Sequence, residues 1–260
     1  MAIPPPGRPD SRKSGPAGQV VYAHPPLVES WLGMDFVPGI EWTDADSDAL
    51  QSGLGPEWPG TWQELPSGSN RSIRQLTNVM GDRALRLKSD GFCFGWLGHG
   101  GERYPRYESV RDGFVAVLDR IRALADRSGT TAEPKHWSVR YVNRIPRGTV
   151  WTTPGDWAFF TLWQPIPLSG LRIDPSGFRG RWDLRLENDR GKLTIEFHHV
   201  PGDEQDEAEN VWITLTASGR VGDSDASLFD GLDHGRDAIV RGFSELVSAD
   251  AKTFWGVRPR

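Results

Sequence analysis

The strongest alternation of apolar and polar residues lies near the middle of the chain, in KHWSVRYVNRIP at residues 135–146. Every second residue from Trp137 onward is Trp, Val, Tyr, Asn and Ile in turn, while Arg140 and Arg144 lie between them. A period of two is typical of a β-strand with one buried face. Because this segment follows the clearest helical pattern and opens the second half, it predicts a central strand that joins two halves.

The first half of the chain predicts the element order β-α-β-β-β-α. Its long helix is the clearest element, since apolar residues recur at helical spacing between Val110 and Ala125. A short helix can be capped by Thr43 or Asp44 and is ended by Gly55-Pro56. The predicted bounds are strands at 27–36, 72–79, 84–88 and 92–97, with helices at 44–54 and 108–126.

The second half predicts the same order without convincing sequence identity to the first. After the central strand come a short helix or apolar loop at 154–162, strands at 178–187, 193–200 and 210–221, and a helix at 228–247. The order predicts an α+β protein with antiparallel strands in one long sheet or two abutting sheets. We expect the long helices to pack on one face and leave a concave face opposite them.

The domain organisation follows from the same pattern. Residues 1–22 are rich in Pro and Gly and predict a disordered tail. Residues 23–134 form the first half and residues 135–260 the second, in one continuous globular unit. A single cysteine and the absence of a long apolar run indicate a soluble protein of the reducing cytoplasm.

Charge and tryptophan content narrow the range of functions that the chain is expected to have. The net charge of −5 argues against bulk attraction to nucleic acid, although a local basic face is compatible with it. Twelve tryptophans are present, and several in segments rich in Pro and Gly are candidates for a groove lining. These are Trp42, Trp58, Trp62, Trp151 and Trp157.

The central strand carries the first candidate site. Arg140 and Arg144 point to the face opposite Tyr141 and Asn143, about 13 Å apart by the rise of a strand. The functional interpretation is a pair of guanidinium forks for a carboxylate or phosphate. The structural interpretation pairs them with Asp or Glu of neighbouring strands, such as Glu187 or Glu196. Asn143 and Tyr141 share the buried face, where the Asn143 amide needs hydrogen-bond partners, and all four residues are candidates for binding a ligand or partner.

Histidine and cysteine offer weaker candidates. His198 and His199 are adjacent on one strand, so they face opposite ways and make a poor chelating pair. His99 lies in a glycine-rich turn and is either a binding residue or general base, or a solvated turn residue. Cys93 lies in an apolar strand and predicts an inert core thiol. No motif predicts a catalytic residue, a metal or a cofactor.

Four segments together resemble a sporadically distributed bacterial family of uncharacterised proteins of similar length. They are PPLVE at 25–29, YPRYE at 104–108, RYVNRI at 140–145 and the C-terminal helix that runs into AKTFWG at 251–256. The resemblance spans most of residues 24–256 and implies no activity, cofactor or catalytic residue. A patchy distribution is compatible with an accessory role in defence or biosynthesis.

The sequence therefore favours a non-enzymatic binding or accessory protein. It would hold a peptide, a partner protein or a small acidic ligand on a sheet face. One alternative is an enzyme of unrecognised type that uses His99, His198 or His199 with a carboxylate. A second alternative is nucleic-acid binding through a local arginine face, which the negative net charge disfavours.

Overall fold

A computed structural model describes residues 21–37, 39–40, 42–66, 73–98, 103–161, 177–202, 208–222 and 224–258. The strands are β1 (Val21–Tyr22), β2 (Leu27–Val37), β3 (Gln63–Leu65), β4 (Ile73–Thr77), β5 (Arg83–Lys88), β6 (Gly91–Leu97), β7 (Glu133–Pro146), β8 (Arg179–Arg185), β9 (Lys192–Val200), β10 (Asn210–Arg220) and β11 (Val257–Arg258). The helices are α1 (Asp44–Leu54), α2 (Tyr107–Arg127), η1 (Pro154–Phe159), η2 (Glu187–Asp189), α3 (Asp225–Leu246) and α4 (Ala249–Phe254).

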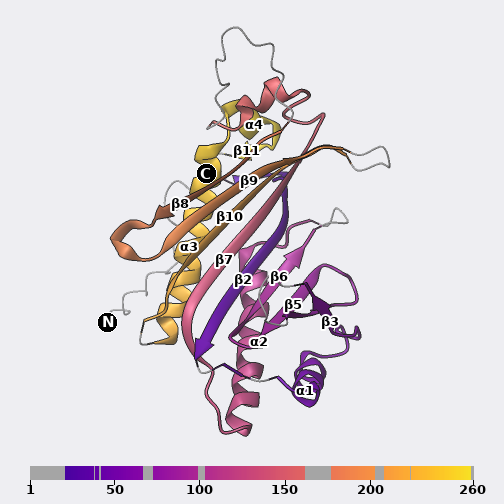
Figure 1. Cartoon of the computed structure of the whole chain (residues 1–260), viewed down its shortest axis with the longest axis vertical. Coiled ribbons are helices and arrows are strands. Elements are labelled where there is room, and N and C mark those ends of the chain that lie inside the picture. The colour runs from indigo at the N-terminus through magenta and orange to yellow at the C-terminus, as the bar shows by residue number, and fades with distance from the viewer. Residues whose placement is uncertain are drawn as a thin grey trace, which may run out of the picture.

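The described strands form one nine-stranded antiparallel sheet and a two-stranded ribbon (Figure 1). The order in the large sheet is β3-β4-β5-β6-β2-β7-β10-β9-β8. From the middle of the sheet outward, the first half has the order β2-β6-β5-β4 and the second half the order β7-β10-β9-β8. In each half the first strand therefore lies at the centre, where the two halves meet, and the last strand lies beside it. The repeated order of elements is therefore also a repeated arrangement in space.

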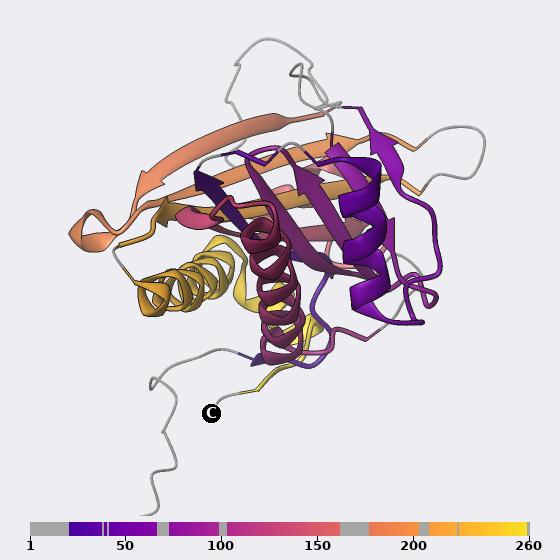
Figure 2. The same ribbon diagram turned by 90° about the horizontal axis from the view of Figure 1, so that it is seen from below.

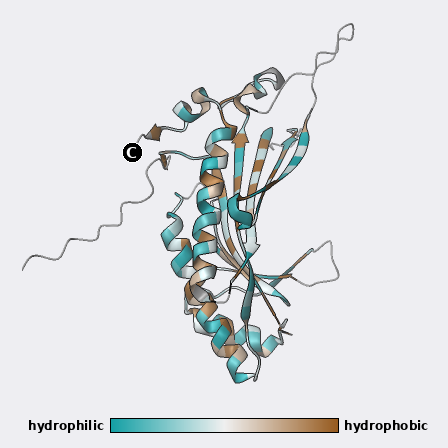
Figure 3. Ribbon diagram, turned by 90° about the vertical axis from the view of Figure 1, so that its left-hand side faces the viewer, coloured by the Kyte–Doolittle hydropathy of each residue, from teal (hydrophilic) through white to brown (hydrophobic). Residues whose placement is uncertain are grey.

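The predicted central strand is confirmed. β7 lies between β2 of the first half and β10 of the second, antiparallel to both, and pairs with each over most of its length. Its seam with β2 joins the two halves into a single sheet. The helices α2 and α3 lie together against one face of this sheet (Figures 2 and 3), which confirms an α+β fold with the long helices on one face.

Glycines let the helices approach the sheet closely. The indole of Trp137 on β7 lies against Gly231 and Gly235 of α3, where an added Cβ would come within 2.4 and 2.5 Å of its ring. On the other side of the seam, Phe94 of β6 lies against Gly113 of α2, and an added Cβ there would come within 2.4 Å. Only a residue without a side chain fits beneath each buried ring.

Polar contacts join the two long helices. The hydroxyl of Tyr107 on α2 donates to Oδ1 of Asp233 on α3 at 2.7 Å, and Arg111 lies 3.3 Å from the same oxygen. The guanidinium of Arg236 lies over the ring of Tyr107 at 5.6 Å. Burial and the bond to Asp233 raise the pKa of Tyr107 well above its ordinary value, so the phenol stays protonated as a donor.

Local differences from the sequence pattern are small. The sequence pattern predicts no element between the helix at 44–54 and the strand at 72–79, but residues 63–65 form the edge strand β3. The ambiguous segment near 154–162 contains a 3₁₀ helix. The tail is predicted to extend to residue 22, but Val21 and Tyr22 pair with β11. Residues 1–20 lie outside the described residues.

Candidate functional site

The open face of the sheet is the side away from α1, α2 and α3. Cross-strand partners share a face, so the register assigns its side chains. In the part of β2 and β5–β10 that pairs in regular register, nine basic and four acidic side chains lie on the open face, which leaves a formal charge of +5. The basic residues are Arg86, Lys88, Arg140, Arg144, Arg179, Arg181, Arg185, Lys192 and Arg220, and the acidic ones are Glu29, Asp35, Asp183 and Glu196.

The four helices α1–α4 carry the opposite charge. Their sequences contain thirteen acidic and seven basic residues, a formal charge of −6. The net charge of −5 for the whole chain therefore conceals a separation between a basic sheet face and an acidic helical layer. The net charge does not describe what a ligand meets, because a ligand responds to the local potential of the face it approaches.

Trp31 of β2 lies at the centre of the open face beneath Arg86 of β5. The Arg86 guanidinium is 3.8 Å from the centroid of the indole, and its Nε donates to Oε1 of Gln75 at 2.8 Å. The indole Nε1 donates to Glu29 at 2.7 Å, and the whole side chain of Trp31 is only 4% exposed. These contacts hold the Arg86 guanidinium in place while no described residue accepts a hydrogen bond from its two terminal nitrogens.

Arg140 of β7 is the direct cross-strand neighbour of Trp31 and is exposed. Burial, together with the like charge of Arg140, lowers the pKa of Arg86, although Glu29 and Cys93 oppose this effect. Arg86 and Arg140 therefore both border the Trp31 indole, and the charge of each acts on the other at the centre of the sheet. Bringing them together costs free energy that an anion between them would recover.

Small residues form the floor beside this pair. Gly91, Cys93 and Gly95 alternate along β6 on the open face, and an added Cβ at Gly95 would lie 2.5 Å from the Trp31 ring. Cys93 is half-buried here, so the prediction of a core thiol is wrong about its face. Burial raises the pKa of its thiol, which keeps the sulfur protonated.

Arg144 and His198, two further predicted residues, also lie on the open face. The register places Arg144 (β7), Trp212 (β10), His198 (β9) and Arg179 (β8) side by side across four adjacent strands. Burial and the charge of Arg179 lower the pKa of His198, against the charge of Glu196. The structural interpretation of the arginine pair is not supported, since Glu196 pairs with Arg181 at 3.2 Å instead.

Tyr141 and Asn143 are not part of this face. Both are buried against the helical layer, where the Tyr141 hydroxyl lies 3.0 Å from that of Tyr104 and the Asn143 amide donates to the carbonyl of Ile213. Both candidates therefore lie on the face opposite Arg140 and Arg144, as the alternation of the strand predicts. His99, another predicted binding residue, lies outside the described residues.

His199 points to the helical side, opposite His198, as the alternation predicts. Its Nε2 lies 2.7 Å from Oε1 of Glu209, and Arg147 contacts the other carboxylate oxygen at 2.9 Å. Rings of Trp151 and Trp157 lie 5.9 and 5.0 Å from the imidazole, whose side chain is 3% exposed. This is a histidine–carboxylate pair enclosed by aromatic side chains.

The five tryptophans predicted to line a groove do not share one, although Trp42 lines a recess between α1 and α2. Trp58, Trp151 and Trp157 are buried in the core, and half-buried Trp42 donates its indole N–H to the carbonyl of Lys88 at 2.9 Å. The fifth residue, Trp62, packs against the same core. The tryptophans that matter for the open face are instead Trp31 and Trp212, which lie within regular strands.

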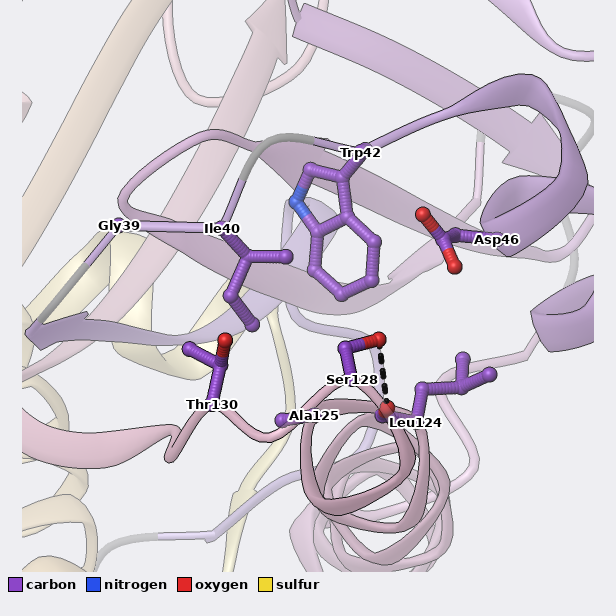
Figure 4. A pocket seen from close by; sticks show the side chains of 8 residues that line it. All are labelled: Gly39, Ile40, Trp42, Asp46, Leu124, Ala125, Ser128 and Thr130. Carbon is purple, nitrogen blue, oxygen red and sulfur yellow. Dashed lines mark hydrogen bonds between the residues drawn. The ribbon is translucent and has the colours of Figure 1, made fainter.

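A recess of about 290 Å³ lies between the start of α1 and the end of α2 (Figure 4). Several of its polar groups have partners within the protein. Asp46 accepts hydrogen bonds from Thr43 in a capping box, and the Ser128 hydroxyl donates to the Leu124 carbonyl at 3.2 Å. With Asp46 and Ser128 engaged in this way, the recess has the character of a packing gap between helix ends.

Sequence reasoning missed Trp31 and Arg86. The available signal was the glycine pattern, because Gly91 and Gly95 sit two residues on either side of Cys93 and leave one face of β6 bare. A strand with glycines at alternate positions marks the close approach of another group. That group is the Trp31 indole, and the Arg86 guanidinium stacks over its ring.

No protein-family model and no curated protein matches the sequence. The resemblance to a sporadic bacterial family thus stays a prediction. Within the described part of the chain, no three His, Cys, Asp or Glu side chains gather closely enough to hold a metal ion. No described helix is long and apolar enough to cross a membrane.

Proposed function

We propose that this protein binds an acidic ligand, or the acidic surface of a partner protein, on the open face of its sheet without catalysing a reaction. The observation that carries the proposal is the Arg86–Arg140 pair. Neither guanidinium has a carboxylate within 4.0 Å among the described residues. A single cysteine and a bacterial family resemblance support a cytoplasmic location in bacteria, in an accessory role.

The chemistry of the pair suits carboxylate or phosphate. A guanidinium presents paired N–H donors in a plane, which match the two oxygens of either group. Arg86 is held by Trp31 and Gln75, so little conformational entropy is lost when it binds. Arg140 is exposed and can close on the ligand from β7, the strand beside that of Trp31.

Calorimetric titration with inorganic pyrophosphate and with a short polyglutamate peptide tests the proposal. Arg140→Ala and Arg86→Ala should each weaken binding of at least one probe by about tenfold or more, since each removes a charged hydrogen-bond donor. Arg241→Ala, which removes an exposed arginine on α3, is the matched control and should bind as the parent does. Unchanged binding in both open-face variants would refute the site, as would unfolding of Arg140→Ala, because Arg140 would then be structural.

Catalysis by a histidine–carboxylate pair is the alternative. The contact between His199 and Glu209 at 2.7 Å favours it, because that geometry orients an imidazole for proton transfer. The side chain of His199 is 3% exposed and is enclosed by Trp151 and Trp157, so a substrate would have to displace these rings to reach it. Access therefore favours the open face as the functional site.

A further inference from the structure

The acidic side chains of the open face are all engaged within the protein. Lys88 pairs with Asp35 at 2.9 Å, and Glu29 accepts the indole N–H of Trp31. Arg181 pairs with both of the remaining carboxylates, at 3.0 and 3.2 Å. Seven basic side chains then have no carboxylate within 4.0 Å among the described residues, namely Arg86, Arg140, Arg144, Arg179, Arg185, Lys192 and Arg220.

These seven charges are spread over the sheet from β5 to β8 and are not gathered in one pocket. Neighbouring strands lie about 4.8 Å apart, so the span from Arg86 on β5 to Arg179 on β8 is about 30 Å. A single phosphate or carboxylate engages the central pair and leaves the others unpartnered. The distribution fits an extended ligand that carries many negative charges and crosses the strands.

Aromatic groups are interleaved with the charges. In the row across β7, β10, β9 and β8, the half-buried rings of Trp212 and His198 lie between Arg144 and Arg179. Because burial and Arg179 lower the pKa of His198, its imidazole is neutral at pH 7 and presents a flat ring without a charge. Flat rings flanked by guanidinium groups offer stacking surfaces beside sites for phosphate.

We propose that the ligand of the open face is single-stranded nucleic acid, whose phosphates contact the unpaired arginines and whose bases stack on Trp212 and His198. This inference rests on the proposed function and names the class of its ligand. A duplex keeps its bases stacked on one another and offers no free ring face, so the single strand is the better fit. An acidic peptide satisfies the arginines but has no planar groups for the aromatic row.

Fluorescence anisotropy with a labelled oligothymidylate of about 12 nucleotides tests this. Trp212→Leu should weaken binding about tenfold, whereas Trp212→Phe, which keeps a ring, should retain most of the affinity. Arg144→Ala should lower the slope of log affinity against log salt concentration by about 0.7, the value for one phosphate contact on a single strand. Arg241→Ala on the helical side should leave both quantities unchanged.

A matched strand of abasic nucleotides and a polyglutamate of similar charge separate the possible failures. Tighter binding of the oligothymidylate than of either probe, lost on Trp212→Leu, supports the inference. If all three probes bind equally and Trp212→Leu has no effect, the face binds polyanions without contacting bases, so the inference fails while the proposed function stands. If no anionic probe binds, both are overturned.

Discussion

Trp137 and the glycines of α3 give the sharpest test of the fold. A methyl group at Gly231 would lie 2.4 Å from Cδ1 and Nε1 of the indole, more than 1 Å inside the usual contact distance. The ring has no room to withdraw, because Trp137 is 2% exposed and also abuts Gly235 and Gly219. We therefore predict that Gly231→Ala destabilises the protein.

The expected magnitude is a difference between two effects. Overpacking a rigid core costs about 1–3 kcal/mol, and replacing glycine by alanine in a helix returns about 1 kcal/mol. Because the overlap is with a ring that cannot move, the upper part of the first range applies. The free energy of unfolding should fall by about 1–2 kcal/mol, which lowers the melting temperature by roughly 2–8 °C.

Urea unfolding of four proteins measures the effect: the parent, Gly231→Ala, Trp137→Leu and the double variant. In the Trp137→Leu background the ring is absent, so Gly231→Ala should be neutral or stabilise by up to about 1 kcal/mol. Gly53→Ala on α1 is a matched control, since an added Cβ there meets only the flexible Arg120 side chain at 3.4 Å. A Gly231→Ala variant as stable as the parent, or an equal cost in both backgrounds, would refute the predicted contact.

Three further predictions concern the two faces of the sheet. Gly95→Ala should displace the Trp31 ring and so weaken the binding of pyrophosphate measured by calorimetry. An affinity equal to that of the parent would contradict a binding site at Trp31 and Arg86. Tyr141→Phe removes the hydrogen bond with the Tyr104 hydroxyl and should lower the free energy of unfolding in urea by about 1 kcal/mol. An unchanged midpoint of urea unfolding would count against a stabilising role for this hydrogen bond. The pKa of His198 lies below its ordinary value of 6.5, so the unfolded chain takes up this proton first as the pH falls. The free energy of unfolding measured in urea should thus fall as the pH drops below 6.5, and it should fall less in His198→Gln than in the parent. An equal decline in the parent and in His198→Gln would show that another group is responsible.

Regular elements were predictable because each has a strong local cause. The alternation around Trp137 and the helical spacing from Val110 onward fixed the central strand and α2 to within two residues. Short elements such as β3, only three residues long, escaped because pairing with β4 creates them and no local pattern marks them. The pairing order of strands depends on contacts distant in sequence, which periodicity does not encode.

The candidate site was predictable only in part. Alternation placed Arg140 and Arg144 on one face, but it could not identify Arg86, whose position beside Arg140 depends on two intervening strands. Net charge pointed away from polyanions because a sum over the chain contains no information about which side each charge occupies. The separation of charge arises only when the register of β5 to β10 is fixed.

The seam between β2 and β7 has a consequence for synthesis of the chain. β2 is translated early, and roughly a third of the chain separates it from β7. Their pairing is therefore of high contact order. Until β7 leaves the ribosome, the largely buried strand Leu27–Val37 stands at the edge of an incomplete sheet and is open to pairing with another nascent chain. The first half made alone should therefore be prone to association, which the second half should suppress by supplying β7 as the partner of β2.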